Sequence, residues 1–268
     1  MVSVDSNLGA FPFGEPVRAV VERDRRKRDV FVLGVYSSAV HARWIGPRGG
    51  TRVMALAVAN EPCPFWKGEG VDEIIARIQV PEEAGRLVSA GGRFNGPSGI
   101  ALEDDALKPL GLIRNDVWCA DLVTHSCANA GQRKAIEREY VKVASRLGLP
   151  EANMPELPKR LADDTRRDEI VAELEESGAR VLITLGTPPL RWFLSAFGGR
   201  KSLQFYGRHV SVYGHAHQMT IARREYAVVP LAHPRQTGGL GMHSTVWREV
   251  HSSWKAETAA GLKTGLGF

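Results

Sequence analysis

The sequence has little cysteine and no long apolar run, and each absence excludes a class of protein. Only Cys63, Cys119 and Cys127 occur among 268 residues, and none belongs to a C-x-x-C pair. A disulfide framework or a zinc knuckle is therefore not expected. No apolar stretch approaches the roughly 20 residues of a membrane span, and the N-terminus lacks the regions of a signal peptide. We expect a cytoplasmic protein without membrane contact.

Neither sign of charge dominates the chain. Lysine and arginine number 35 against 30 acidic residues, so the formal net charge is +5 at pH 7. Such a balance permits a polyanionic partner but does not require one. A hydrophobic content of 43% is ordinary for a globular protein, and no internal repeat or clear linker divides the chain. We predict one domain over residues 1–268, and a monomer.

Apolar runs of strand length alternate with helical segments. Near-continuous apolar character, typical of strands buried on both faces, occurs at 30–36, 52–58, 116–123, 180–186 and 226–231. Helical patterns occupy 71–80, 130–148 and 166–178, and a C-terminal amphipathic helix is predicted from Val246, Val250 and Trp254. This alternation predicts an α/β fold, a three-layer α/β/α sandwich around a mostly parallel sheet.

Ligands of such sheets bind beyond the carboxyl ends of the strands. The residues expected there are Tyr36, Ser37, Ser38, Asn60, Glu61, Pro62, Thr124, His125, Gly186, Thr187, Pro188, His233 and Pro234. Thr187 could also cap a helix whose first turn contains Pro188.

Two general site types fit this pattern poorly. Ser37 or Ser38, Asp121 and His233 follow the chain order of a serine hydrolase, but the G-x-S-x-G elbow is missing. The eight histidines show no ligand spacing such as H-E-x-x-H, so no metal site is expected.

Four segments together carry a family resemblance. "DVFVLGVYSSAVHARW", "DVWCADLVTHS", "RVLITLGTPPLRWFL" and "VVPLAHPRQTGGLG" follow one another in an order and spacing that resemble the uracil-DNA glycosylase superfamily, over roughly residues 29–255. The resemblance implies an α/β/α sandwich with a four-stranded parallel sheet. It implies removal of uracil, or a related deaminated base, from DNA to leave an abasic site. The superfamily branches with an iron–sulfur cluster need four cysteines, so no cofactor is expected here.

The resemblance also assigns roles to individual residues. A glycosylase flips the target nucleotide into a pocket, where His233 would donate a hydrogen bond to the negative charge developing on the departing base. Leu240 would fill the gap left in the duplex or, alternatively, only anchor its loop. The remaining assignments are Gly34, Val35, Ser37 and Phe65 for base binding, and Ser38, Thr187, Arg235, Thr237 and Gly238 for DNA binding.

The sequence departs from the family at two catalytic positions. Tyr36 stands where some members place a carboxylate, and a phenol of pKa about 10 is a poor base, so it could orient water, wall the pocket or pack. Asp121 stands where the family has an asparagine that reads the base. It could read the base when protonated, activate water when ionised, or serve as a helix cap or salt bridge; we favour water activation slightly.

The turn "NEPCPFW" at 60–66 offers further candidates. Phe65 could stack on the flipped base or belong to the core. Glu61 could position water, although a surface glutamate is the more common state. Two other functions stay open: a catalytically weak module that binds uracil-containing or abasic DNA, and a small-molecule hydrolase.

Overall fold

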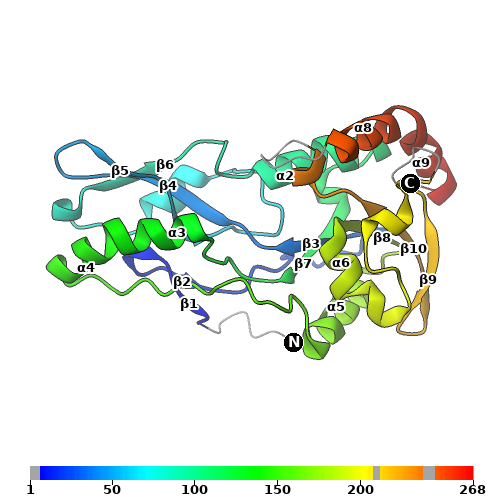
Figure 1. Cartoon of the computed structure of the whole chain (residues 1–268), viewed down its shortest axis with the longest axis horizontal. Coiled ribbons are helices and arrows are strands. Elements are labelled where there is room, and N and C mark those ends of the chain that lie inside the picture. Colours follow the sequence, from blue (N-terminus) through cyan, green and yellow to red (C-terminus); the bar gives the residue numbers. More distant parts are fainter. Residues whose placement is uncertain (1–6, 208–211, 238–244, 268) are drawn as a thin grey trace.

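The computed structural model describes residues 7–207, 212–237 and 245–267 and has a mixed α/β architecture (Figure 1). The strands are β1 Gly9–Ala10, β2 Pro16–Val17, β3 Val30–Tyr36, β4 Ala39–Ile45, β5 Thr51–Asn60, β6 Arg86–Ser89, β7 Val117–Val123, β8 Val181–Leu185, β9 His217–Ile221 and β10 Arg224–Leu231. The α-helices are α1 Val71–Ala76, α2 Pro97–Leu102, α3 Ala130–Ala135, α4 Val141–Leu147, α5 Asp164–Ser177, α6 Thr187–Trp192, α7 Pro234–Thr237, α8 Thr245–Ser253 and α9 Ala259–Leu266.

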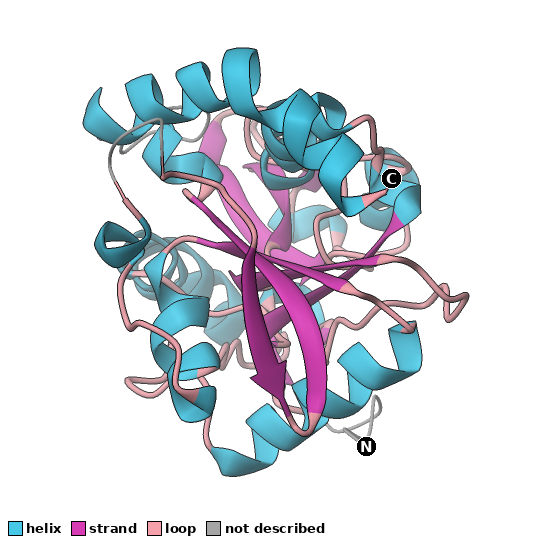
Figure 2. Cartoon of the chain, turned by 90° about the vertical axis from the view of Figure 1, so that its right-hand side faces the viewer, coloured by secondary structure: helices cyan, strands magenta, loops and turns pink. Residues whose placement is uncertain are grey.

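The main sheet has five strands in the order β7-β3-β8-β10-β9, and Figure 2 shows its twist among the surrounding helices. The first four strands are parallel, as their continuous apolar runs predict. The expected total of four strands is wrong, because β9 adds an antiparallel edge beside β10. The residues of β9 alternate between half-buried and exposed up to the buried Ile221. This strand therefore has no continuous apolar run from which it could be predicted.

The apolar run at 52–58 does not join the main sheet, contrary to expectation. It forms β5, which pairs antiparallel with β4 in a separate sheet of order β5-β4-β6. The cause is the short connection after β4, where Gly46 N–H donates to Gly50 O at 2.8 Å. A turn this short can only join antiparallel strands, since a parallel pair needs a crossover of a dozen residues or more.

The two sheets have separate hydrophobic cores. One surrounds the five-stranded sheet, and the other lies between the three-stranded sheet, α1 and the helical stretch from α3 to α4. Phe65 belongs to the first core and its neighbour Trp66 to the second. The turn at 60–66 therefore ties the two parts of the molecule together at the carboxyl end of β3.

The outer edge of β7 is covered by groups from elsewhere in the chain. The Arg166 guanidinium, on α5, donates to the carbonyl oxygens of Asp121 at 2.8 Å and Leu122 at 3.2 Å. Val20 N–H donates to Thr124 O at 2.6 Å. These bonds satisfy backbone groups that an edge strand would otherwise expose, and they fix the end of β7 where Asp121 lies. Within the described ranges, no helix is long and apolar enough to cross a membrane.

Candidate active site

The carboxyl ends of four parallel strands bring the predicted residues to one edge of the main sheet. Asp121 lies near the end of β7, Gly34 on β3, Gly186 after β8 and His233 after β10. Since β4 begins three residues after β3 ends, this edge faces the three-stranded sheet (Figure 1). A crevice beyond the carboxyl ends is where sheets of this type bind ligands.

Gly34 allows Asp121 and Phe65 to approach the backbone of β3. A Cβ added at Gly34 would collide with Asp121 Oδ1 and would lie 2.6 Å from Phe65 Cζ. Phe65 is buried and has a φ of 55°, a left-handed conformation that is costly for an aromatic residue. The close approach places the Phe65 ring against the strand end, beside the Asp121 carboxyl, and the surrounding packing must offset the cost of the strained backbone.

Asp121 is 3% exposed, so it is buried and does not lie on the surface. Burial raises the pKa of Asp121 to about 7. The Arg166 charge, the Ser37 hydroxyl and Val35 N–H oppose this shift, since each stabilises the ionised form. Ser37 Oγ lies 3.4 Å from Asp121 Oδ2. Near neutral pH the Asp121 carboxyl can therefore change its charge state.

Glu61 is a second buried carboxyl at this strand end. It is 5% exposed and accepts a hydrogen bond of 2.9 Å from Ser38 N–H, so the account of Glu61 as a surface residue is wrong. Burial and the nearby Asp121 charge raise the pKa of Glu61 to about 8. Two interacting buried carboxyls titrate as a pair, so ionising one makes ionisation of the other harder.

Ser37 is not arranged as the nucleophile of a serine hydrolase. Its hydroxyl oxygen lies 3.4 Å from Asp121 Oδ2 and 3.2 Å from Thr124 O, and the residue is buried. A Ser-His-Asp triad places the imidazole between the hydroxyl and the carboxylate. Here Ser37 reaches Asp121 directly, and His233 follows a strand two positions farther along the sheet.

His233 is held at the end of β10 by its backbone. Gln236 Oε1 accepts a hydrogen bond of 3.0 Å from His233 N–H, and His233 O accepts from Gln236 N–H at 2.7 Å. Gly186, with a φ of 79°, leaves room beside it, because an added Cβ would lie 3.1 Å from His233 Cβ. The sequence analysis did not predict Gln236 as a residue of the site. In the sequence it is marked by its position three residues after the histidine.

A hydrogen-bond chain fixes the residue before His233. Ala232 N–H donates to Tyr213 Oη at 2.7 Å, and Tyr213 Oη lies 2.8 Å from His251 Nδ1. His251 Nε2 lies 2.8 Å from Asp105 O, an oxygen that can only accept, so Nε2 carries the proton. Burial lowers the pKa of His251, which favours a neutral ring whose Nδ1 accepts from the tyrosine. The end of β10 is thereby joined to α8.

Three other predicted residues have definite positions at the edge of the sheet. Tyr36 is 37% exposed at the end of β3, so it is not a core residue. Ser38 O accepts a hydrogen bond of 2.5 Å from Ser126 Oγ. Thr187 is the first residue of α6 and Gly186 is the N-cap, so the expectation that Thr187 caps the helix is wrong. Gly186 takes the cap because its left-handed φ suits glycine.

The loop after His233 is described in part. Thr237 Oγ1 donates to Pro234 O at 3.1 Å inside α7. Arg235 belongs to the same helix, but its side chain lies outside what the structure describes. Gly238 and Leu240 also lie outside the described residues, so their roles stay predictions from the sequence.

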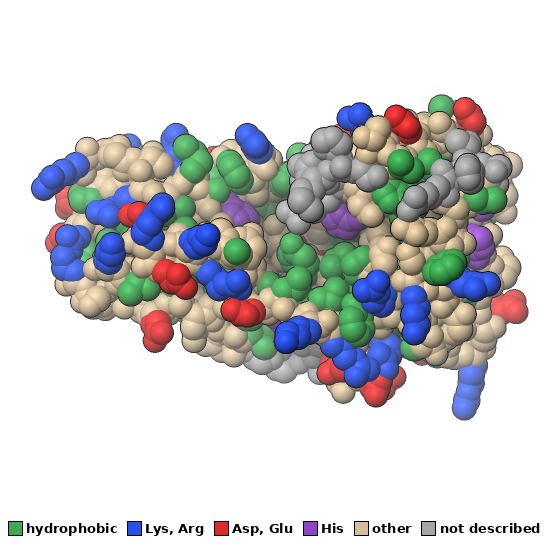
Figure 3. Space-filling view, viewed as in Figure 1, with side chains coloured by type: hydrophobic (Ala, Val, Ile, Leu, Met, Phe, Trp, Pro, Cys, Tyr) green, Lys and Arg blue, Asp and Glu red, His purple; other side chains and the backbone are tan. Residues whose placement is uncertain are grey.

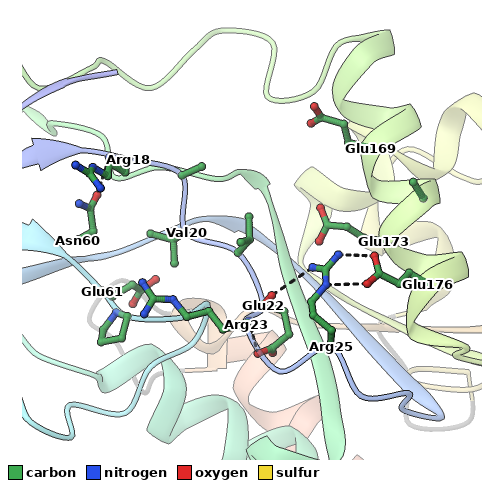
Figure 4. A pocket seen from close by; sticks show the side chains of 14 residues that line it. Arg18, Val20, Glu22, Arg23, Arg25, Asn60, Glu61, Glu169, Glu173 and Glu176 are labelled. Atoms are coloured by element: carbon green, nitrogen blue, oxygen red, sulfur yellow. Dashed lines mark hydrogen bonds and ion pairs between the residues drawn. The ribbon is translucent and has the colours of Figure 1, made fainter. Parts of the chain in front are cut away.

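A cavity of about 520 Å³ lies beside β7, between residues 18–25, the turn at 60–62 and α5 (Figure 4). Glu61 lines it, whereas Asp121 and His233 do not. The Arg25 guanidinium pairs with the Glu176 carboxylate across one side. The volume falls in the range of small-ligand pockets. Glu61 is therefore the carboxyl that connects this cavity with the strand-end site.

No group of three or more His, Cys, Asp or Glu side chains among the described residues could hold a metal ion. No protein-family model matches the chain, and a search of curated proteins finds no significant relative.

Proposed function

We propose that the protein is a monofunctional DNA glycosylase that hydrolyses the N-glycosidic bond of uracil, or of a related deaminated base, in DNA. The observation that carries this proposal is one sheet edge with an aromatic ring and an ionisable carboxyl at one end and a histidine at the other. Phe65 and Asp121 meet at Gly34, and His233 follows β10. We also propose that the fold is a three-layer α/β/α sandwich. The monomeric state and the cytoplasmic location stay predictions.

The reaction needs a flipped base, a stabilised leaving group and a nucleophile. The base leaves the stack and enters the crevice at the strand ends, beside the buried Phe65 ring. Ionised Asp121 accepts a proton from a water molecule whose oxygen bonds to C1′ of the sugar. The bond between C1′ and the base nitrogen breaks, and its electron pair leaves with the base. His233 donates a hydrogen bond to the resulting negative charge, which stabilises the transition state.

Glu61 adjusts the charge state of this site. Its carboxyl is buried, and a negative charge on Asp121 makes its ionisation harder. With Glu61 protonated, Asp121 is the carboxyl that ionises first and can act as the base. Excision by the wild type should therefore increase as pH rises through about 7, the pKa of Asp121. The Asp121→Asn variant should be nearly inactive, because an amide accepts no proton from water.

An end-labelled duplex with one uracil tests the proposal. After incubation, alkali cleaves any abasic site, so a labelled fragment of the expected length supports glycosylase activity. A matched duplex with thymine in place of uracil is the control and should stay intact. A gel shift without cleavage would replace the proposal by the binding module. If the duplex is neither cleaved nor bound, DNA is not the substrate.

The cavity beside β7 favours a second candidate, a small-molecule hydrolase that uses Glu61. Its volume and its buried carboxyl suit a small ligand. The Ala172→Trp substitution, at an exposed position of α5 on the cavity wall, would partly fill this space. Uracil excision at the wild-type rate by this variant would separate the cavity from the glycosylase site. Loss of excision at unchanged stability would show instead that the cavity is part of the glycosylase site.

A further inference from the structure

The helical stretch from α3 to α4 carries positive charge along one side. α3, a π-turn at Ile136–Tyr140 and α4 follow without interruption, and the residues that join them keep right-handed helical angles. Lys134, Arg138, Lys142 and Arg146 recur every four residues along it and are all exposed. We call these four residues the basic stripe.

The geometry of the helix keeps the basic stripe on one side. In a regular α-helix, residues four apart drift by about 40° around the axis. The π-turn is wider than an α-turn, so it offsets part of that drift in the middle of the stretch. Ile136, Tyr140 and Val143 face the opposite way and are buried in the second core. The apolar face therefore anchors the helix and leaves the basic stripe in solvent.

Little in the described part of the chain neutralises these cations. Arg138 pairs with its neighbour Glu139 at 3.0 Å but its side chain stays 74% exposed. Lys134, Lys142 and Arg146 form no ion pair with a described residue. Figure 3 shows lysine and arginine side chains spread over the part of the surface that α3 and α4 form.

The helical stretch that carries the basic stripe follows β7 in the chain. α3 begins seven residues after the end of β7, the strand that carries Asp121. Gln132 fixes the helix to β5, since its Oε1 accepts from Ala57 N–H at 2.9 Å and its Nε2 donates to Ala55 O at 2.8 Å. The cations therefore extend away from the site along a rigidly attached helix.

We propose that the basic stripe binds the phosphate backbone of duplex DNA on one side of the flipped nucleotide. Twelve residues of helix span about 18 Å, and phosphates of one strand rise by about 3.4 Å per base pair. The stripe thus matches about five base pairs of backbone. The contact to DNA follows from charge and spacing, and only its place beside a flipped base rests on the proposed function.

The test compares two triple variants that remove the same charge. The stripe variant is Lys134→Gln, Arg138→Gln, Lys142→Gln. The control variant is Lys27→Gln, Arg180→Gln, Arg223→Gln, three exposed cations that precede β3, β8 and β10 at the opposite edge of the main sheet. The dissociation constant for a uracil-free duplex is measured at several salt concentrations, after matching unfolding temperatures exclude misfolding.

The logarithm of the binding constant falls linearly with the logarithm of the salt concentration. For the stripe variant this slope should become shallower by about one unit per removed phosphate contact, about two to three units in total. Its affinity at low salt should decrease by about tenfold or more, whereas the control variant should change by less than one unit of slope. Equal changes in both variants would show a net-charge effect and overturn the proposal. So would a stripe variant that binds like the wild type.

A second measurement locates the contact relative to the lesion. Uracil duplexes are shortened on one side of the uracil or on the other. Wild-type excision should decline when one particular side falls below about five base pairs, and the stripe variant should lose this asymmetry. A wild type that binds duplex DNA through the stripe but cleaves no uracil would leave this proposal standing and remove the proposed function. If cleavage declines equally when either side of the uracil is shortened, the proposal for the basic stripe is overturned and the proposed function is not.

Discussion

The two ends of the candidate site are built in different ways. At the acidic end, Gly34 lets the Asp121 and Phe65 side chains approach the backbone of β3, and the carboxyls of Asp121 and Glu61 are both buried. At the histidine end, hydrogen bonds to the backbone hold His233 in place, and its side chain is only half-buried. Changes at the acidic end should therefore alter both stability and chemistry. Changes at the histidine end should alter chemistry with little effect on folding.

At the histidine end, the largest effect is expected from His233. His233→Ala should lower the single-turnover rate of uracil excision by about 100-fold or more, the scale of losing one hydrogen-bond donor to a developing negative charge. Its free energy of unfolding should stay close to that of the wild type. The control is His215→Ala, an exposed histidine just before β9. Single-turnover cleavage near the wild-type rate would remove His233 from the mechanism.

Gly34→Ala tests the close packing of the acidic end. The new Cβ would collide with Asp121 Oδ1 and crowd the Phe65 ring, so the free energy of unfolding should decrease by about 1–3 kcal/mol. Excision should decrease as well, because Asp121 and Phe65 must move. Gly50→Ala is the control, since an added Cβ there has no atom within 4 Å. Denaturant unfolding that does not distinguish the two variants would contradict this packing.

The sequence predicted the parts of the fold that have one dominant signal. Continuous apolar runs located β3, β7, β8 and β10, and the rule for strand ends placed His233 at the edge of the sheet. Asp121 was singled out by the family resemblance. β9 was missed because its residues alternate in burial. The run of β5 was assigned to the wrong sheet, because apolar character alone does not distinguish pairing with β4 from pairing in the main sheet.

Contacts between distant residues were beyond the sequence. Buried Glu61 accepts a hydrogen bond from Ser38 N–H, 23 residues away. It also lies in a turn between two sheets, whereas the sequence predicted a single sheet. The hydrogen-bond chain through Tyr213 and His251 joins residues 38 apart, and nothing in their spacing indicates it. Such contacts arise only once the strand order and the helix positions are known.

The carboxyl pair should make stability depend on pH. The pKa of Asp121 is raised from 3.8 to about 7, and that of Glu61 from 4.5 to about 8. The folded state thus retains protons that the unfolded state releases above about pH 5, and the free energy of unfolding should decrease as pH rises to about 8. The slope is at most about 1.4 kcal/mol per pH unit for each proton.

The double variant Asp121→Asn, Glu61→Gln should flatten this profile. The control pair is Asp72→Asn, Glu73→Gln, which changes two exposed carboxylates of α1 and should keep the wild-type slope. Urea unfolding at a series of pH values measures both. Parallel profiles for wild type and the Asp121 and Glu61 double variant would mean that these carboxyls are not protonated in the folded protein.

The smallest effect should come from Gln236, whose side chain accepts a hydrogen bond from the His233 backbone. Gln236→Ala removes the acceptor of His233 N–H, and one such hydrogen bond contributes about 0.5–1.5 kcal/mol. If that energy holds the imidazole in position, single-turnover excision should slow by about 3- to 10-fold while DNA binding stays unchanged. Gln236→Glu keeps an acceptor at the same place and should restore most of the rate. If the glutamate variant is as slow as the alanine variant, the side chain at 236 acts on the reaction by a route other than this hydrogen bond. If neither differs from the wild type, the turn after β10 positions His233 without it.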